Sequence, residues 1–280
     1  MKIAVSVEST NDLTKELLEK YDIRVIPYQI VLDDRTFADG EISTEELFDY
    51  VDKSGKLPKT NALNAFEYTE FFEKLKKDYD AVVHVCLSSG LTSSTQNAIN
   101  AAKNVKNVFV VDSKSLSTGI GLLAIYAREL AEKGEKPEQI AKKVSDRAEK
   151  LQVSFVIERL DYLYKGGRCN SLQFFGANLL KLRPRIVVKN GKMGADKKYR
   201  GTMGKVVAKY CEEVLDEFDA PDLDKVFITY TTATDEMIEA AKAAVSERGF
   251  KNIYQTRAGC TIASHCGANT LGILYFNDGE

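Results

Sequence analysis

Short apolar runs that alternate with helical patterns constrain the fold of this chain most strongly. Three such runs of strand length occupy residues 2–7, 80–87 and 107–112, and helical patterns separate them. Runs that are apolar throughout are typical of parallel strands that helices cover on both faces of a sheet. The first half of the chain therefore predicts an α/β domain built on a mainly parallel sheet.

Local signals predict further elements in this half. Ser43 and Glu46 have the spacing of a capping box, and Asn64 with Glu67 marks a second helix start. We also expect a single strand over residues 23–32. These signals are consistent with the α/β pattern.

The second half predicts a different kind of sheet. Asn190-Gly191 is the strongest short hairpin signal in the chain. A hairpin inserted among β-α units indicates a mixed sheet. We place a domain boundary near Leu151, which divides the chain into an N-terminal α/β domain (1–151) and a C-terminal mixed-sheet α/β domain (152–280).

Charge and length exclude several classes of partner. The 280 residues include 39 basic and 41 acidic side chains, for a net charge of -2. This balance provides no attraction to nucleic acid or to anionic membranes, so any membrane contact would be transient. Apolar runs are far shorter than the roughly 18 residues that a membrane span needs. A small neutral or amphiphilic ligand is a natural partner.

Cysteine usage predicts a reduced compartment. The five cysteines have irregular spacing and form no CxxC pair, so neither a disulfide framework nor a structural zinc site is expected. The chain opens with a strand-like run rather than a secretory signal pattern. We therefore expect a cytoplasmic protein without a metal.

Four loop segments are rich in small hydroxylic residues. Ser88 and Ser89, in the most informative of them, follow a predicted buried strand at its C-terminal end. Ligands bind at that end of open parallel sheets, and the N-terminus of the next helix favours an anion there. An ordinary helix cap explains the two serines equally well. The other three segments are residues 8–10, 58–61 and 263–272.

The chain has two histidines with different expected roles. His84 lies inside the predicted strand 80–87 and is expected to be a satisfied core residue. His265 lies among small residues in a predicted loop before the last strand, where a lone histidine is more often structural than functional. With Cys266 it has no zinc-site spacing.

Two further patterns are interpreted conservatively. Residues 119–124 match a GxGxxA dinucleotide motif, but they fall inside a predicted helix rather than a tight strand-helix turn. We therefore expect no nucleotide cofactor. Lys197, Lys198 and Arg200 form a small basic cluster, which by default is a solvated face.

Five motifs in order resemble those of the DegV family and span essentially the whole chain. The opening KIAVSVESTNDL is similar to the family's strand followed by Asp-Ser-Thr, with Glu8 in the acidic position. PKTNALN resembles PKTSQPS, and LSSGLTSSTQNA resembles LSSxLSGTYxSA. DYLYKGGRCN with the helical pattern FFGANLLKLRP matches the family's KGGR segment, and SHCGANTLG matches its tail. Within these motifs the sequence differs from the family at several positions. The resemblance therefore leaves open which fatty-acid chain the protein would prefer.

The resemblance implies a two-domain fold that holds a fatty acid between its domains. It assigns the carboxylate to hydroxyls at Thr60 and Ser89, with Ser88 beside them, and it places His265 and Arg168 nearby. It implies a lipid-binding carrier rather than an enzyme.

The resemblance also implies a partner. The position of Arg200 is implicated in docking a fatty acid kinase subunit, which phosphorylates the bound carboxylate. The acid then leaves as an acyl phosphate for phospholipid synthesis.

Two other functions stay open from the residues alone. Ser88 or Ser89 as nucleophile and His265 as base would make an esterase, although the chain has no GxSxG motif and no evident orienting acid. A regulator that binds a sugar, a nucleotide or another small polar ligand would fit the same fold.

Overall fold

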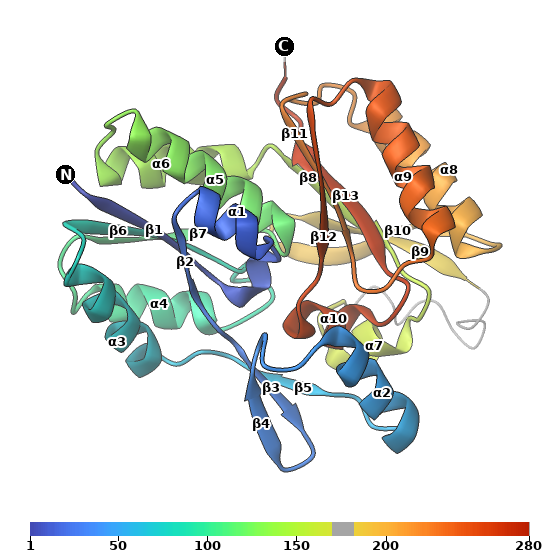
Figure 1. Cartoon of the computed structure of the whole chain (residues 1–280), viewed down its shortest axis with the longest axis horizontal. Helices are drawn as coiled ribbons and strands as arrows, with labels where there is room; N and C mark the ends of the chain where they lie inside the picture. The colour runs from blue at the N-terminus through green and yellow to red at the C-terminus, as the bar shows by residue number, and fades with distance from the viewer. Residues whose placement is uncertain (170–181, 280) are drawn as a thin grey trace.

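The computed structural model describes residues 1–169 and 182–279 (Figure 1). A four-stranded parallel sheet in the first half has the order β2-β1-β6-β7. Its strands are β1 (Ile3–Glu8), β2 (Ile23–Ile26), β6 (Ala81–Cys86) and β7 (Val108–Asp112). All residues of β1 and β6 are buried, as expected for central strands that are covered on both faces. The predicted parallel sheet is confirmed.

Two pairs of helices cover this sheet. Figure 1 shows α3 (Ala65–Lys76) and α4 (Ser94–Ala102) on one face, and α5 (Thr118–Glu132) with α6 (Pro137–Ala148) on the other. The short helix α1 (Lys15–Lys20) follows β1. Both predicted capping boxes are present, at the starts of α2 (Thr44–Ser54) and α3.

The first half also contains a small antiparallel sheet that the sequence analysis missed. Its order is β4-β3-β5. The strands are β3 (Gln29–Leu32), β4 (Arg35–Ala38) and β5 (Lys59–Asn61). The single strand expected over residues 23–32 is wrong, because it breaks at Pro27 and Tyr28. Proline has no N–H for a strand ladder, and the N–H of Tyr28 donates to Ser9 Oγ at 3.1 Å instead.

The second half forms a six-stranded sheet of order β10-β9-β8-β13-β11-β12. Only β11 and β12 pair in parallel, so the sheet is mixed, as predicted. The hairpin turn lies at Asn190 and Gly191, whose positive φ angles of 51° and 76° suit a tight two-residue turn. The strands are β8 (Leu151–Val156), β9 (Arg183–Lys189), β10 (Lys192–Tyr199), β11 (Lys225–Tyr230), β12 (Asn252–Arg257) and β13 (Leu271–Phe276).

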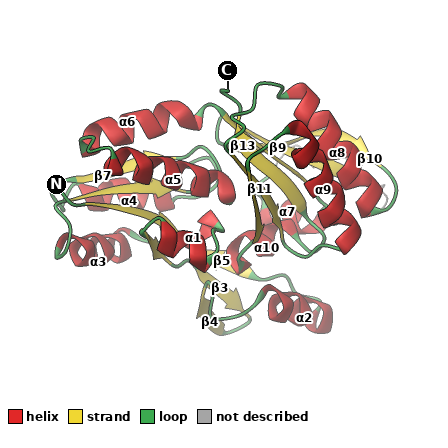
Figure 2. Ribbon diagram, turned by 45° about the horizontal axis from the view of Figure 1, so that its top comes forward, coloured by secondary structure: helices red, strands yellow, loops and turns green. Residues whose placement is uncertain are grey.

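Helices α8 (Met203–Glu217) and α9 (Asp235–Arg248) pack side by side on one face of this sheet (Figure 2). Two shorter helices, α7 (Asp161–Gly166) and α10 (Cys260–Cys266), contact each other, and α10 also contacts β3 and β5 of the small sheet. The expected loop over residues 263–272 is therefore wrong in its first part, where α10 continues to Cys266.

Helix α5 links the two large sheets. It contacts β1 and β6 on one side and β8 and β13 on the other. Gly121 lies in this helix and not at a phosphate loop, and a Cβ there would lie 2.6 Å from Cδ2 of Leu13. The glycines of the GxGxxA motif thus allow close packing of α5, in agreement with the dismissal of a dinucleotide site.

The predicted boundary near Leu151 coincides with the first residue of β8, so the two large sheets fall on either side of it. One hydrophobic core extends across that point, because Val153 and Phe155 pack in the same cluster as Ile120 and Leu123 of α5. The division into domains 1–151 and 152–280 therefore stays a prediction. The expected helix within residues 174–181 lies outside the described residues. No helix in the described part of the chain is long and apolar enough to cross a membrane.

Candidate functional site

A mostly apolar cavity of about 260 Å³ lies between the loops of the first half and α10. The loop after β6 contributes Leu87, Leu91 and Thr92 to its wall. Ile262 and His265 of α10 face them from the second half. The cavity is therefore built from segments that are far apart in the sequence.

One end of the cavity is polar. Thr60, Arg168 and His265 line both this cavity and a neighbouring depression of about 430 Å³. Lys59 and Lys165 add two more cationic side chains to that depression. This end favours an anionic group.

The other end is apolar and leads towards the sheet of the second half. Leu116, Ile262 and Cys266 line both the main cavity and a small adjoining pocket of about 20 Å³. Phe155 and Leu274 form part of the wall of that small pocket. An amphiphilic ligand would therefore have one preferred orientation here.

Thr60 and His265 meet at the polar end. Thr60 Oγ1 and His265 Nε2 are 3.0 Å apart, within hydrogen-bonding distance. Thr60 is held in β5, where it pairs with Ile30 of β3, and His265 occupies the last turn of α10. The long-range pairing of these two predicted residues depends on how α10 packs against the small sheet.

His265 is an uncharged hydrogen-bonding group at neutral pH. Burial, together with the nearby positive charge of Arg168, lowers its pKa to about 4. Within residues 1–169 and 182–279, its Nδ1 has no hydrogen-bond partner. A Cβ at Gly166 would lie 2.7 Å from this Nδ1 atom, so only glycine leaves room for the ring in this position.

Arg168 lies just after α7, and its side chain is exposed at the polar end of the cavity. Its Nη1 donates to the carbonyl oxygen of Gly166 at 2.6 Å. The structure thus brings together three of the predicted site residues, Thr60, His265 and Arg168. Their role in binding stays a prediction.

Ser88 and Ser89 lie in the loop after β6 but do not line the cavity. The buried hydroxyl of Ser88 donates to the carbonyl oxygen of Gly191 at 2.7 Å. The hydroxyl of Ser89 donates to Asp112 Oδ2 at 2.5 Å, and its N–H donates to the other carboxylate oxygen. Both hydroxyls therefore shape the loop in this structure, and their contact with a ligand stays a prediction.

The cavity has polar wall residues that the sequence analysis did not select. Thr92 and Ser93 follow in the same loop, and Tyr28 lies in the break between β2 and β3. Thr92 Oγ1 lies 3.3 Å from the hydroxyl oxygen of Tyr28, and burial raises the pKa of that phenol. The hydroxylic loop pattern was a usable signal for Thr92, whereas no local pattern indicated Tyr28.

The arrangement does not form an esterase triad within the described residues. The hydroxyls of Ser88 and Ser89 donate to Gly191 and Asp112, whereas His265 Nε2 meets Thr60. A general base must lie within hydrogen-bonding reach of its nucleophile. Neither Ser88 nor Ser89 forms such a pair with His265, and the serine–histidine pair that is present, Ser6 with His84, is fully buried and inaccessible to a substrate.

Arg200 lies on a different part of the surface. It is exposed beside the end of β10, in a depression of about 520 Å³ that Lys205 and Lys209 also line. Among the residues that the structure describes, this depression and the cavity have no lining residue in common. The predicted docking role of Arg200 stays a prediction.

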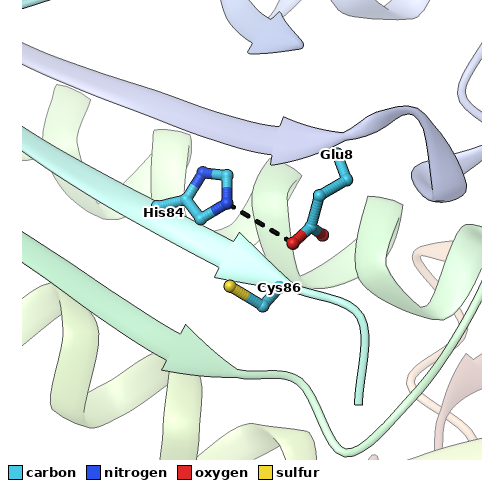
Figure 3. A group of neighbouring side chains, drawn as sticks. All are labelled: Glu8, His84 and Cys86. Atoms are coloured by element: carbon cyan, nitrogen blue, oxygen red, sulfur yellow. Dashed lines mark ion pairs between the residues drawn. The ribbon is translucent and has the colours of Figure 1, made fainter. Parts of the chain in front are cut away.

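A buried polar group lies behind the cavity loop and includes Glu8, His84 and Cys86 (Figure 3). His84 Nε2 is 3.6 Å from Glu8 Oε1, and burial raises the pKa of the Cys86 thiol well above its ordinary value. Both carboxylate oxygens of Glu8 already accept hydrogen bonds, from the Tyr68 hydroxyl at 2.6 Å and from the Leu87 N–H at 2.8 Å.

This group explains how the end of β6 is held. Glu8 fixes the N–H of Leu87, the first residue of the loop that forms the cavity wall. Hydrogen bonds occupy both oxygens of the Glu8 carboxylate, so the group is best described as a structural network. The expectation of a satisfied His84 holds for Nδ1, which lies 2.9 Å from Ser6 Oγ, but Nε2 has no hydrogen-bond partner in the described residues.

Comparisons with known proteins identify the family to which the chain is similar. A family model described as "Uncharacterised protein, DegV family" matches residues 2–278. A relative from Thermotoga maritima named "Fatty acid-binding protein" is 31% identical over 281 residues, which cover 97% of this chain and 96% of the relative.

Solved structures are similar over the full length. A DegV family protein from Thermus thermophilus, described by its fatty acid binding, has a TM-score of 0.89 and 27% identity, with 99% of each chain covered. DegV from Bacillus subtilis, described as a fatty acid binding protein, has a TM-score of 0.86 and 27% identity, again with 99% of each chain covered. The order of motifs, the paired sheets and the family match lead to one conclusion: the chain belongs to the DegV family.

Proposed function

We propose that this protein binds one long-chain fatty acid in the cavity and presents its carboxylate to a partner kinase. The observation that carries the proposal is the difference between the two ends of the cavity. Thr60, His265 and Arg168 surround one end, whereas Leu116 and Ile262 continue the other into an apolar pocket. A molecule with an anionic head and an apolar tail matches both ends.

The tail provides most of the binding free energy. Burial of roughly 14 methylene groups, at about 0.8 kcal/mol each, contributes on the order of 11 kcal/mol. Association and ordering costs offset a large part of this gain. A polar ligand of the same size would gain far less in a cavity lined mainly by apolar side chains.

The head would be held mostly by uncharged groups. An ionised carboxylate costs several kcal/mol to bury unless it is hydrogen-bonded. The Thr60 hydroxyl and the neutral His265 imidazole are available at the polar end, with the exposed Arg168 nearby. Ser89 would join them only by exchanging its hydrogen bond with Asp112 for one with the ligand.

The neutral donors leave one carboxylate oxygen accessible to a second protein. We propose that this second protein is a fatty acid kinase subunit, which docks near Arg200 and forms an acyl phosphate for phospholipid synthesis. The setting would be the cytoplasm, where the five buried thiols would stay reduced. The names of the Thermotoga and Bacillus relatives support the same class of ligand.

Native mass spectrometry of the purified protein tests the ligand. We expect a bound mass that matches a long-chain fatty acid, and we expect protein stripped by mild denaturation and refolded to take up added oleate. A co-purified sugar or nucleotide, or a refolded protein that takes up no oleate, would contradict the proposal.

Acyl-phosphate formation tests the partner. With ATP and a fatty acid kinase subunit, Arg200→Ala should slow trapping of the acyl phosphate by hydroxylamine while leaving oleate affinity unchanged. Arg35→Ala, which removes an exposed arginine from the small sheet, is the matched control. Equal rates for both variants would remove Arg200 from the docking surface.

A further inference from the structure

Two carboxylates from the first half of the chain hold the N-terminal end of α10. The N–H of Gly259 donates to Asp12 Oδ1 at 2.8 Å. The N–H groups of Cys260 and Thr261 donate to the two carboxylate oxygens of Asp39 at 2.9 and 3.3 Å. A helix leaves its first N–H groups without partners inside the helix, so these three bonds replace a local cap.

The local sequence of α10 cannot provide such a cap. The residue at the cap position is Gly259, which has no side chain to accept a hydrogen bond. A Cβ there would lie 3.2 Å from Asp39 Oδ1 and 3.5 Å from Asp12 Oδ1. The bare backbone therefore lets both carboxyl groups approach the helix and accept its N–H groups. The helix dipole favours negative charge there, whereas burial raises the pKa of Asp12 well above its ordinary value.

The two carboxylates are themselves held in place. Asp39 Oδ2 accepts a hydrogen bond from the Ser9 hydroxyl at 2.9 Å, next to β1. Asp12 Oδ2 accepts one from the Ser117 hydroxyl at 2.5 Å, at the start of α5. Each carboxylate thus connects α10 to an element of the first half.

We infer that Asp12 and Asp39 are positioning residues for the fatty-acid site. They set the position of α10, and α10 in turn brings Ile262 and His265 to the cavity wall. This inference rests on the proposed fatty-acid binding.

A short helix transmits a displacement of its N-terminal end directly to its last turn. His265 lies five residues beyond Cys260, about 8 Å along the helix axis at 1.5 Å per residue. A shift of α10 by an ångström would lengthen the 3.0 Å contact between His265 and Thr60 and admit water to the imidazole. The solvent exposure of His265 should therefore change when the hydrogen bonds that Asp12 and Asp39 accept at the start of α10 are weakened.

Two variants weaken this attachment. Asp39→Asn removes the charge and one of the two acceptor oxygens at the start of α10. Ser117→Ala is milder and removes only the hydroxyl that holds Asp12, so it remains informative if Asp39→Asn does not fold. Thr234→Ala is the matched control, because it removes a side-chain cap from α9, which lies outside the cavity.

Two measurements decide the inference. Oleate dissociation constants should rise about tenfold or more in Asp39→Asn, rise by a smaller factor in Ser117→Ala, and stay unchanged in Thr234→Ala. The chain has two histidines, so NMR of ¹⁵N-histidine-labelled protein resolves the titration of His265. Its pKa should move from about 4 towards 6.5 in the first two variants and stay in place in the control.

An unchanged oleate affinity and an unchanged His265 titration in both Asp39→Asn and Ser117→Ala would overturn the inference. So would equal effects of Thr234→Ala, since the cause would then be general destabilisation. If the parent protein binds no oleate, the proposed function fails. The NMR titration needs no ligand, so it still decides separately whether the carboxylates position His265.

Discussion

Replacement of Thr60 by valine removes one hydroxyl from the polar end of the cavity and nearly preserves the shape of the side chain. Valine suits a strand at least as well as threonine, so β5 should remain intact. The lost group is the hydroxyl that meets His265 Nε2 at 3.0 Å. The variant therefore isolates the hydrogen-bonding role that we propose for Thr60.

The expected magnitude follows from the charge of the ligand. A hydrogen bond to a charged group contributes about 1.5–3 kcal/mol. The oleate dissociation constant should therefore rise roughly 10- to 150-fold, at about 1.4 kcal/mol for each factor of ten. Loss of the His265 contact adds to the effect, because the bound carboxylate then meets a less well oriented imidazole.

Isothermal titration calorimetry with oleate measures this change. Thr69→Val is the matched control: Thr69 is also half-buried, but its hydroxyl donates to the carbonyl oxygen of Ala65 within α3, outside the cavity. We expect the control to bind oleate as the parent does. Parent-like affinity of Thr60→Val would refute the assignment of the carboxylate to this end of the cavity.

The remaining predictions concern His265 and the apolar end. Gly166→Ala should displace the imidazole, because the added Cβ would lie 2.7 Å from Nδ1, and oleate affinity should fall several-fold; Gly194→Ala, with open space around its Cβ, should change nothing. The pKa of His265 is about 4 in the folded state, and its ordinary value is 6.5. Between these two pH values the unfolded chain binds a proton that the folded protein does not, so the free energy of unfolding should fall as the pH drops from 7.5 to 5. Measured by urea unfolding, this fall in the free energy of unfolding should be larger in the parent protein than in His265→Gln, by at most about 2 kcal/mol. An equal fall in both proteins would contradict the low pKa of His265. Ile262→Phe should narrow the passage to the small apolar pocket and shift binding from oleate to shorter acids; an unchanged preference in competition assays would place the tail elsewhere.

Several features of the fold follow from local sequence alone. The apolar runs became β1, β6 and β7, because strands that are covered on both faces favour apolar side chains at most positions rather than at alternate ones. The Asn190-Gly191 turn and the capping box of Ser43 with Glu46 formed where they were predicted. In each case the deciding contacts lie within a few residues, so the pattern of side chains determines the outcome.

Local reasoning failed where a distant group decides the structure. Residues 23–32 contain a strong strand pattern, yet Pro27 and the bond from the Tyr28 N–H to Ser9 divide them into two strands of different sheets. Residues 260–266 form a helix although Gly259 cannot cap it, because Asp12 and Asp39 supply acceptors from more than 200 residues away.

The site shows the same division. Sequence by itself determined which loops are rich in hydroxyls and, through the family motifs, indicated Thr60, Ser89 and His265 as candidates. Tertiary structure alone decided that Thr60 meets His265 across 205 positions, while the hydroxyl of Ser89 turns to Asp112. The type of side chain defines the hydrogen bonds that a residue can make, but the packing of α10 and the loop after β6 selects the partner.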